Sequence, residues 1–297
     1  MGKQVLFLGM GGGYSHAALQ TLVEGGAAVR AVVFPRLGAD DAGPRWMPAA
    51  AKRVGAAELV VKPVSENILT LAGEHGIPVL EVGSMRDMAT LEVIRELQPD
   101  LAVTACFPQI LPEEFLDIPI SGCLNIHPSM LPAYRGPEPL FWQFRAGEQN
   151  MGVTVHWMDT GVDTGAVLAQ RQVEFAEGMR TEAADRLAAS RGAEMILQAL
   201  RSEEFPRGAQ GSEGASYQPA PQDADRRIPA GWGVKRAFNF MRGAQAWAPF
   251  WIEAEVGGRL EVSEAVGYSQ GVRLGQAFVE QGDEKHVQMG DGILIVK

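Results

Sequence analysis

The sequence has little of what would mark a secreted, membrane or nucleic-acid-coating protein. Its 297 residues include two cysteines, too few for a disulfide scaffold or a four-cysteine metal site. No apolar run approaches the length of about 18 residues that a membrane helix needs, and the run after Met1 is too short for a secretory signal. The formal net charge of −10 argues against general binding to nucleic acid. We therefore expect a soluble, cytoplasmic protein with no membrane partner, in which Cys106 and Cys123 are reduced and buried.

What the sequence does contain is an alternation of strand-like and helix-like segments. Apolar residues make up 46% of the chain, enough for a sizeable core, and the length suits two domains. Residues 5–8 and 29–34 are predicted strands, and between them lies a helix that Ser15 would cap and Gly25–Gly26 would end. This spacing is that of a strand–helix–strand unit, which predicts a parallel sheet.

The same rhythm continues after an irregular stretch at 36–62. Further strands are predicted at 79–82, 101–105, 123–126, 153–157 and 167–173, and helices at 67–75, 89–97, 139–146 and 181–200. Residues 205–227 have the composition of a linker. Beyond them we expect a helix at 234–241 and β-like runs at 250–256, 259–266, 276–279 and 293–296, with a hairpin at Gly257–Gly258. The prediction is an α/β domain with a Rossmann-like, mostly parallel sheet at 1–204, a linker at 205–228, and a small β domain at 229–297.

The glycine cluster after the first strand, GMGGGYS, is an incomplete dinucleotide-binding fingerprint. Tyr14 occupies the position of the third glycine, and the second strand ends in AVVFPRLG, without an acid for a ribose hydroxyl. We predict that NAD is not a cofactor. The glycines are interpreted as a tight strand-to-helix turn that lies close to another loop.

Two polar side chains stand at the end of the predicted strand at 123–126. Asn125 and His127 are one residue apart, so they share one face of the strand while Ile126 points into the core. Pro128 then ends the strand, and in an open parallel sheet ligands bind at this carboxyl edge. An amide that stabilises an oxyanion and an imidazole that moves protons suit acyl-type transfer without a covalent intermediate.

The loop at 158–165 adds two carboxylates, Asp159 and Asp163. It offers too few ligands for a calcium loop, and no His-x-His or cysteine pair accompanies it, so we predict no metal. Asp163 is instead expected to pair with His127. His156, which alternates with Trp157 in the preceding strand, is interpreted as a packing or surface residue.

Together these motifs resemble the formyltransferases that use 10-formyltetrahydrofolate, with the layout of methionyl-tRNA formyltransferases. The resemblance rests on Asn125-x-His127-Pro128-Ser129-x-Leu131-Pro132, on Arg135-Gly136 and on Asp163-Thr164-Gly165, and extends to Lys235–Asn239, Trp247, Pro249 and Gly290–Leu294. It implies a Rossmann-like catalytic domain, a linker and a small OB-like β-barrel. It also implies a role in one-carbon metabolism and protein biosynthesis.

The resemblance assigns roles to individual residues. Asn125, His127 and Asp163 match the catalytic residues of the family. The positions that match the folate-binding segments are Cys106, Phe107, Gln109, Ile110, Leu111, Ser129, Met130, Leu131, Pro132 and Asp159. The glycine turn would lie near the acceptor, and the co-substrate would be 10-formyltetrahydrofolate.

The sequence leaves the acceptor open. The segment after the second strand mixes charges and lacks the expected basic motif, and residues 229–297 are nearly neutral. Contacts with phosphate groups dominate the affinity of proteins for nucleic acid. Both observations therefore weaken the case for initiator methionyl-tRNA as the partner. A small amine, such as an amino sugar or amino acid derivative, is the alternative acceptor. A hydrolase that releases formate from the same folate, and a non-catalytic binding protein, are the other hypotheses.

Overall fold

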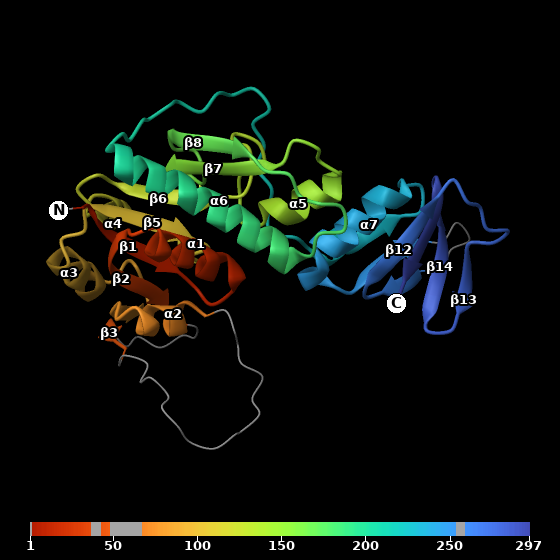
Figure 1. Ribbon diagram of the computed structural model, residues 1–297, viewed down its shortest axis with the longest axis horizontal. Helices are drawn as coiled ribbons and strands as arrows, with labels where there is room; N and C mark the ends of the chain where they lie inside the picture. Colours follow the sequence, from red (N-terminus) through yellow and green to blue (C-terminus); the bar gives the residue numbers. More distant parts are fainter. Residues whose placement is uncertain (1, 37–42, 48–66, 254–258) are drawn as a thin grey trace, which may run out of the picture. The chain divides into compact units, whose positions relative to one another are not determined.

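The computed structural model describes residues 2–36, 43–47, 67–253 and 259–297 (Figure 1). The chain forms two compact units that alternate along the sequence. The first comprises Met1–Pro132, Gly152–Val173 and Asp185–Ala215, and the second Ala133–Met151, Glu174–Ala184 and Ser216–Lys297. The predicted boundaries at 204 and 228 stay predictions. The chain passes from the first unit to the second within the segment that we expected to be a linker.

The first unit is built on one eight-stranded sheet. Its strands are β1 (Gln4–Gly9), β2 (Ala28–Pro35), β3 (Arg45–Trp46), β4 (Val79–Val82), β5 (Leu101–Ala105), β6 (Cys123–His127), β7 (Gly152–Trp157) and β8 (Val167–Gln172). Their order is β3-β4-β2-β1-β5-β6-β7-β8. The strands from β4 to β6 are parallel, whereas β3, β7 and β8 join antiparallel, so the prediction of a mostly parallel sheet is confirmed. The short strand β3 lies in the stretch that was expected to be irregular.

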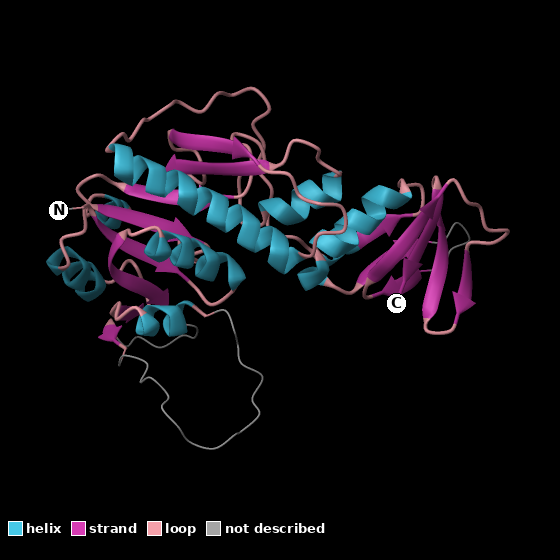
Figure 2. Ribbon diagram, in the orientation of Figure 1, coloured by secondary structure: helices cyan, strands magenta, loops and turns pink. Residues whose placement is uncertain are grey.

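Along the chain, a helix lies between each pair of successive parallel strands from β1 to β6 (Figure 2). They are α1 (Gly13–Glu24), α2 (Ile68–Glu74), α3 (Met88–Glu96), α4 (Glu113–Leu116) and most of α6 (Thr181–Ser202). The predicted cap of the first helix is wrong, because α1 begins at Gly13 and its N-cap, Gly12, makes no side-chain bond. Ser15 is buried inside the helix, where its hydroxyl donates to the Ala105 carbonyl (2.6 Å) and accepts from the Met10 amide (3.1 Å). The hydroxyl thus ties the glycine turn to the end of β5.

The core of the first unit is apolar along the central strands. Every residue of β5 is buried, including Thr104, as its mostly apolar sequence predicts for a parallel strand covered on both faces. Helix α6 approaches β6 so closely that a Cβ on Gly192 would lie 2.2 Å from Cγ2 of Ile126. A side chain at position 192 would therefore press on the residue between Asn125 and His127.

The described residues of the second unit form two complete helices, the start of α6 and two small sheets. Its elements are α5 (Pro139–Ala146), α7 (Val234–Gly243), two 3-10 turns (Asp223–Arg226 and Gln245–Trp247), β9 (Arg227–Pro229), β10 (Phe250–Glu253), β11 (Arg259–Val262), β12 (Ala265–Gln270), β13 (Phe278–Gln281), β14 (Glu284–Met289) and β15 (Gly292–Val296). The sheets have the orders β11-β10-β9 and β12-β15-β14-β13. In the core of this unit, the rings of Phe141 and Phe250 each pack edge-on against the ring of Phe240, with ring centroids 5.3 Å apart in both pairs.

Some expectations for the second unit need correction. The predicted run at 259–266 is two strands, because the amides of Ser263 and Glu264 turn to the Lys297 carbonyl. Strands β9 and β14 were not predicted. The hairpin at Gly257–Gly258 lies outside the described residues, although β10 and β11 do pair antiparallel. Closure of the two sheets into an OB-like barrel stays a prediction.

Candidate functional site

Asn125 and His127 both belong to β6, at the carboxyl edge shared by the parallel strands. The antiparallel neighbour β7 places His156 opposite Asn125 and Thr154 opposite His127. The His127 side chain is buried, with 3% of its surface exposed, and Asn125 is partly exposed. The sheet therefore presents an amide and an imidazole at the edge where the sequence places a ligand site.

Asp163 reaches this edge from the loop between β7 and β8. Its backbone is left-handed (φ 53°), a conformation that aspartate adopts more readily than most residues. Gln210 holds the loop, since its side-chain amide donates to the carbonyls of Asp163 (2.9 Å) and Gly165 (2.7 Å). A Cβ on Gly165 would lie 1.9 Å from the Trp157 carbonyl, so only glycine permits this close return of the chain.

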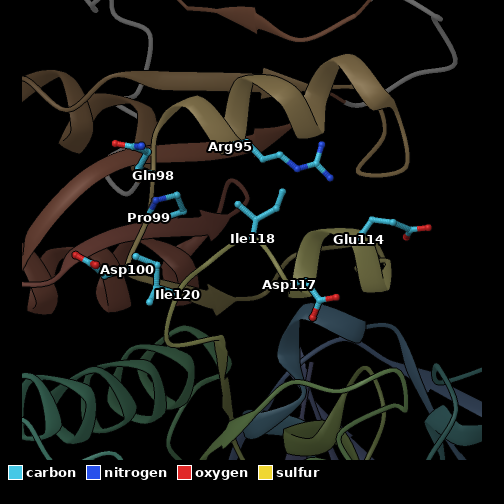
Figure 3. Close-up of a pocket in the computed structure, with 8 residues that line it drawn as sticks. All are labelled: Arg95, Gln98, Pro99, Asp100, Glu114, Asp117, Ile118 and Ile120. Carbon is cyan, nitrogen blue, oxygen red and sulfur yellow. The ribbon is translucent and has the colours of Figure 1, made fainter.

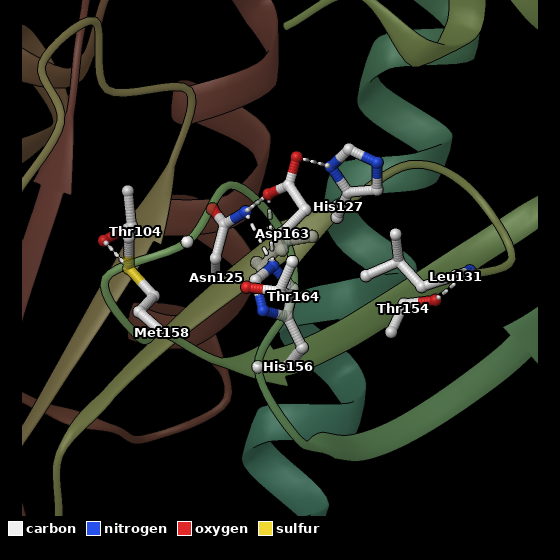
Figure 4. Close-up of polar contacts among 12 residues, drawn as sticks. Thr104, Asn125, His127, Leu131, Thr154, His156, Met158, Asp163 and Thr164 are labelled. Carbon is white, nitrogen blue, oxygen red and sulfur yellow. Dashed lines mark hydrogen bonds and ion pairs between the residues drawn. The ribbon is translucent and has the colours of Figure 1, made fainter. Parts of the chain in front are cut away.

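The carboxylate of Asp163 lies between the other polar groups (Figure 4). Its Oδ2 is 3.6 Å from Nδ1 of His127, and its Oδ1 is 3.4 Å from Nδ2 of Asn125. The first distance is too long for a hydrogen bond but suits an ion pair when the imidazole is protonated. The Asp163 side chain is 12% exposed, so its charge is only weakly screened. The structure thus brings together the three side chains that the sequence singled out.

A fourth residue, His156, joins this cluster and was interpreted too narrowly from the sequence. It is buried, with 2% of its surface exposed, and its Nε2 lies 3.2 Å from Nδ2 of Asn125 and 3.4 Å from Oδ1 of Asp163. The signal that could have found it is the strand pairing. Residues opposite each other on antiparallel strands have neighbouring side chains, and His156 is opposite Asn125.

The glycine turn also reaches the site, through Tyr14. Its hydroxyl donates to the carbonyl of Ile126 (3.1 Å), the residue between Asn125 and His127. Burial raises the pKa of the Tyr14 phenol, and the negative charge of Asp185 and other acidic groups raises it further, so Tyr14 stays protonated. The sequence had marked Tyr14 only as an interruption of the glycine fingerprint.

The first predicted folate-binding segment, 106–111, follows β5. Cys106 is exposed and left-handed (φ 56°), so the expectation that both thiols are buried is wrong for this residue. Ile110 is 70% exposed, Phe107 is partly exposed and Leu111 is buried. The Gln109 side chain is tied to the backbone, accepting from the Met85 amide (2.9 Å) and donating to the Gly83 carbonyl. The exposed members are therefore the ones available for a ligand.

The second predicted segment, 129–132, follows β6 and is fastened to β7. The Thr154 hydroxyl donates to the Ser129 carbonyl (2.7 Å) and accepts from the Leu131 amide (3.1 Å). Ser129 and Leu131 are buried, whereas Met130 and Pro132 are partly exposed. The segment alternates between anchoring residues and residues that face outward.

The remaining predicted folate contact, Asp159, is exposed and supports its own loop. Its Oδ1 accepts from the Gly161 amide (3.0 Å) and from the Thr164 hydroxyl (2.7 Å). The loop conformation that carries Asp163 therefore depends on it.

A cavity of about 610 Å³ (Figure 3) is lined by none of these residues. It is lined by Arg95, Gln98, Pro99, Asp100, Glu114, Asp117, Ile118 and Ile120. Asp100 immediately precedes β5, so this cavity is at the amino-terminal edge of the sheet, opposite the candidate site. Across the described ranges, no group of three or more His, Cys, Asp and Glu side chains is placed to hold a metal ion. None of the helices described for this chain is long and apolar enough to cross a membrane.

The sequence profile of the formyl transferase family matches residues 41–200, a stretch that includes both segments of the cluster. The chain belongs to the formyl transferase family. This formyltransferase is 35% identical over 218 residues to the methionyl-tRNA formyltransferase of Syntrophus aciditrophicus, covering 72% of this chain and 68% of the relative. The corresponding enzyme of Clostridioides difficile is 36% identical over 193 residues, with 64% and 61% covered. The resemblance seen in the sequence motifs is therefore confirmed.

Solved structures give the same fold at lower identity. HypX from Aquifex aeolicus has a TM-score of 0.63 at 19% identity and covers all of this formyltransferase but 44% of that chain. The N-formyltransferase from Helicobacter canadensis has a TM-score of 0.61 at 16% identity, with 100% and 98% covered. At these identities the likeness concerns the fold alone.

Proposed function

We propose that this formyltransferase moves a formyl group from 10-formyltetrahydrofolate to the amino group of an acceptor, with methionyl-tRNA as the acceptor. The observation that carries the proposal is the convergence of Asn125, His127 and Asp163 within 3.4–3.6 Å at the carboxyl end of β6. The relatives that are 35% and 36% identical to this chain over the aligned residues are methionyl-tRNA formyltransferases. Such an enzyme would act in the cytoplasm, in protein biosynthesis.

In the proposed reaction the neutral amine attacks the formyl carbon, and the carbon–nitrogen bond to the folate then breaks. The tetrahedral intermediate carries a negative oxygen, which the Asn125 amide and the protonated His127 imidazole stabilise. Removing one such donor typically lowers the rate by about 100- to 1000-fold. His127 also passes the proton of the amine to the departing folate nitrogen, and Asp163 stabilises the imidazolium during this transfer.

We place the folate against the outward-facing residues that follow β5 and β6. Cys106 and Ile110 on the first segment are exposed, and Met130 and Pro132 on the second are partly exposed. These two segments follow neighbouring strands of the sheet, β5 and β6, and β6 carries Asn125 and His127. Gln109, Leu111, Ser129 and Leu131 would support the pocket from behind rather than contact the ring.

A small amine is the second candidate acceptor. The net charge of −10 opposes binding to the phosphate backbone of RNA. The similar N-formyltransferase of Helicobacter canadensis, which this chain covers almost from end to end, is described in complex with folinic acid and dTDP-3-aminofucose. An amino sugar acceptor would fit both observations.

An acceptor comparison tests the proposal. The protein would be incubated with 10-formyltetrahydrofolate and with charged initiator methionyl-tRNA, with amino sugar nucleotides, or with no acceptor, and both tetrahydrofolate and formylated product would be measured. We expect product only with an amine, and fastest with methionyl-tRNA. Formate release without an acceptor would indicate a hydrolase, and no turnover under any condition would contradict formyl transfer.

A further inference from the structure

The cluster contains a second imidazole, His156, for which the proposed reaction has no step. It lies in β7 directly opposite Asn125. The pairing of β7 with β8 shifts register between Val155 and His156, an irregularity of the kind that redirects a side chain. His156 is almost completely buried, and its ring meets that of His127 edge-on, with centroids 6.3 Å apart.

The contacts of His156 determine where its proton lies. Its Nδ1 is 2.8 Å from the carbonyl oxygen of Trp157. A carbonyl only accepts hydrogen bonds, so Nδ1 carries the proton. In the neutral ring Nε2 then has a lone pair, and this nitrogen accepts from the amide nitrogen of Asn125 at 3.2 Å. The same Nε2 lies 3.4 Å from Oδ1 of Asp163, and the Asn125 amide nitrogen, which faces both acceptors, offsets their mutual repulsion.

The same contacts determine how the Asn125 amide is turned. With its oxygen and nitrogen exchanged, the amide oxygen would face both the Nε2 lone pair at 3.2 Å and the Asp163 carboxylate at 3.4 Å. Both contacts would be repulsive, so the nitrogen faces His156 and Asp163. One amide hydrogen then goes to His156, and the other makes only a long contact with Asp163.

We infer that His156 is a positioning residue that holds the Asn125 amide in the orientation required for oxyanion stabilisation. It accepts one amide hydrogen and so leaves the second, weakly engaged hydrogen to turn to the negative oxygen of the intermediate. This inference rests on the proposed formyl transfer. His156 itself touches neither the folate nor the acceptor, and its effect passes through Asn125.

Two substitutions separate this role from a packing role. His156→Phe keeps the ring but removes the acceptor, and we expect kcat to fall about 10- to 100-fold, less than the loss of an oxyanion donor itself. His156→Gln keeps an acceptor oxygen at the position of Nε2, and we expect kcat within about fivefold of wild type. The KM for folate should stay unchanged in both variants. Equal losses in the two variants, or a change confined to KM, would overturn the inference.

A double-mutant comparison tests whether His156 acts through Asn125. In an Asn125→Ala background the amide is gone, so His156→Phe should lower the remaining rate by less than about threefold. If the two losses instead multiply, His156 acts independently and the inference is wrong.

A measurement that does not depend on turnover tests the role of His156 separately from the proposed function. In protein labelled with ¹⁵N-histidine, long-range ¹H–¹⁵N spectra report which ring nitrogen is protonated, and the signal of His156 is identified by its absence in His156→Gln. We expect a proton on Nδ1 and none on Nε2. A proton on Nε2 would overturn the inference even if formyl transfer is observed. If the expected tautomer is observed but the protein transfers no formyl group, the proposed function is contradicted, whereas the hydrogen bond between His156 and Asn125 is supported.

Discussion

Replacing Asp163 with asparagine removes the negative charge from the centre of the cluster while keeping the shape of the side chain. The carboxylate lies 3.6 Å from Nδ1 of His127, which is protonated during the proposed proton transfer. Two unit charges at this distance interact by about 4–5 kcal/mol at an effective dielectric constant of about 20. Since the Asp163 side chain retains some exposure, we take about 3–4 kcal/mol as the loss, which corresponds to a rate about 150- to 1000-fold lower.

The assay is single-turnover formyl transfer with saturating folate and acceptor, because this isolates the chemical step from binding. Glu194→Gln is the matched control. Glu194 is a surface carboxylate of the same unit, paired with Arg171 and Arg191, and its loss should leave the rate unchanged. A fall of less than about tenfold in Asp163→Asn, with the melting temperature unchanged, would show that the charge does not stabilise the imidazolium.

Three further predictions concern the first unit. Gly192→Ala should lower the free energy of unfolding by about 1–3 kcal/mol in urea titration, because its Cβ would overlap a β6 side chain; an unchanged midpoint would contradict the close approach. Ellman's reagent at pH 8 should react with Cys106 in the native protein and with Cys123 only after unfolding, since burial raises the pKa of Cys123 to about 12; two fast thiols would refute this. Burial raises the pKa of Glu81, but hydrogen bonds from two arginines have the larger effect, so the pKa is lowered in the folded protein. The Glu81 carboxylate therefore stabilises the fold at pH values above the pKa that it has in the unfolded chain, and this stabilisation is lost in acid. Glu81→Gln should therefore cost about 1–3 kcal/mol at pH 7 and progressively less below about pH 4; an equal cost at both pH values would exclude the ionic contribution.

The central strands could be predicted because their sequence signal is local. The strand at Leu101–Ala105 is a mostly apolar run that follows the turn Gln98-Pro99-Asp100, and its predicted and observed limits agree. Helix α5 is equally well delimited, with proline at its start and Gly147 in the left-handed conformation at its end. Where propensity, apolar pattern and turn residues coincide, the element follows from the sequence.

The elements that the sequence missed depend on distant partners. Strand β14 is amphipathic and interrupted by charged residues, and it is stabilised by pairing with β13 and β15 on either side. Ser15 has the chemistry of a helix cap, but a buried bond to Ala105, ninety residues away, places it inside the helix. Neither contact leaves a periodic signal that a local pattern could reveal.

The candidate site shows the same distinction. Asn125 and His127 could be placed together because a strand alternates its side chains. Predicting that His156 lies in the cluster requires knowledge of the register between β6 and β7, which no sequence motif reveals. The exposure of Cys106 likewise follows from a left-handed backbone at the end of β5 and not from its residue type.

The grip of Gln210 on the loop has a mechanical consequence. Residues 205–210 run beside the sheet, where the Pro206 carbonyl accepts from the Trp157 indole (2.9 Å) and Gly208 pairs with Val167. The same stretch ends in the amide that holds the main chain on both sides of Thr164. A displacement of residues 205–210 would therefore move the carboxylate of Asp163 even if no strand of the sheet moved. The geometry of the cluster therefore depends on a segment whose composition is that of a linker.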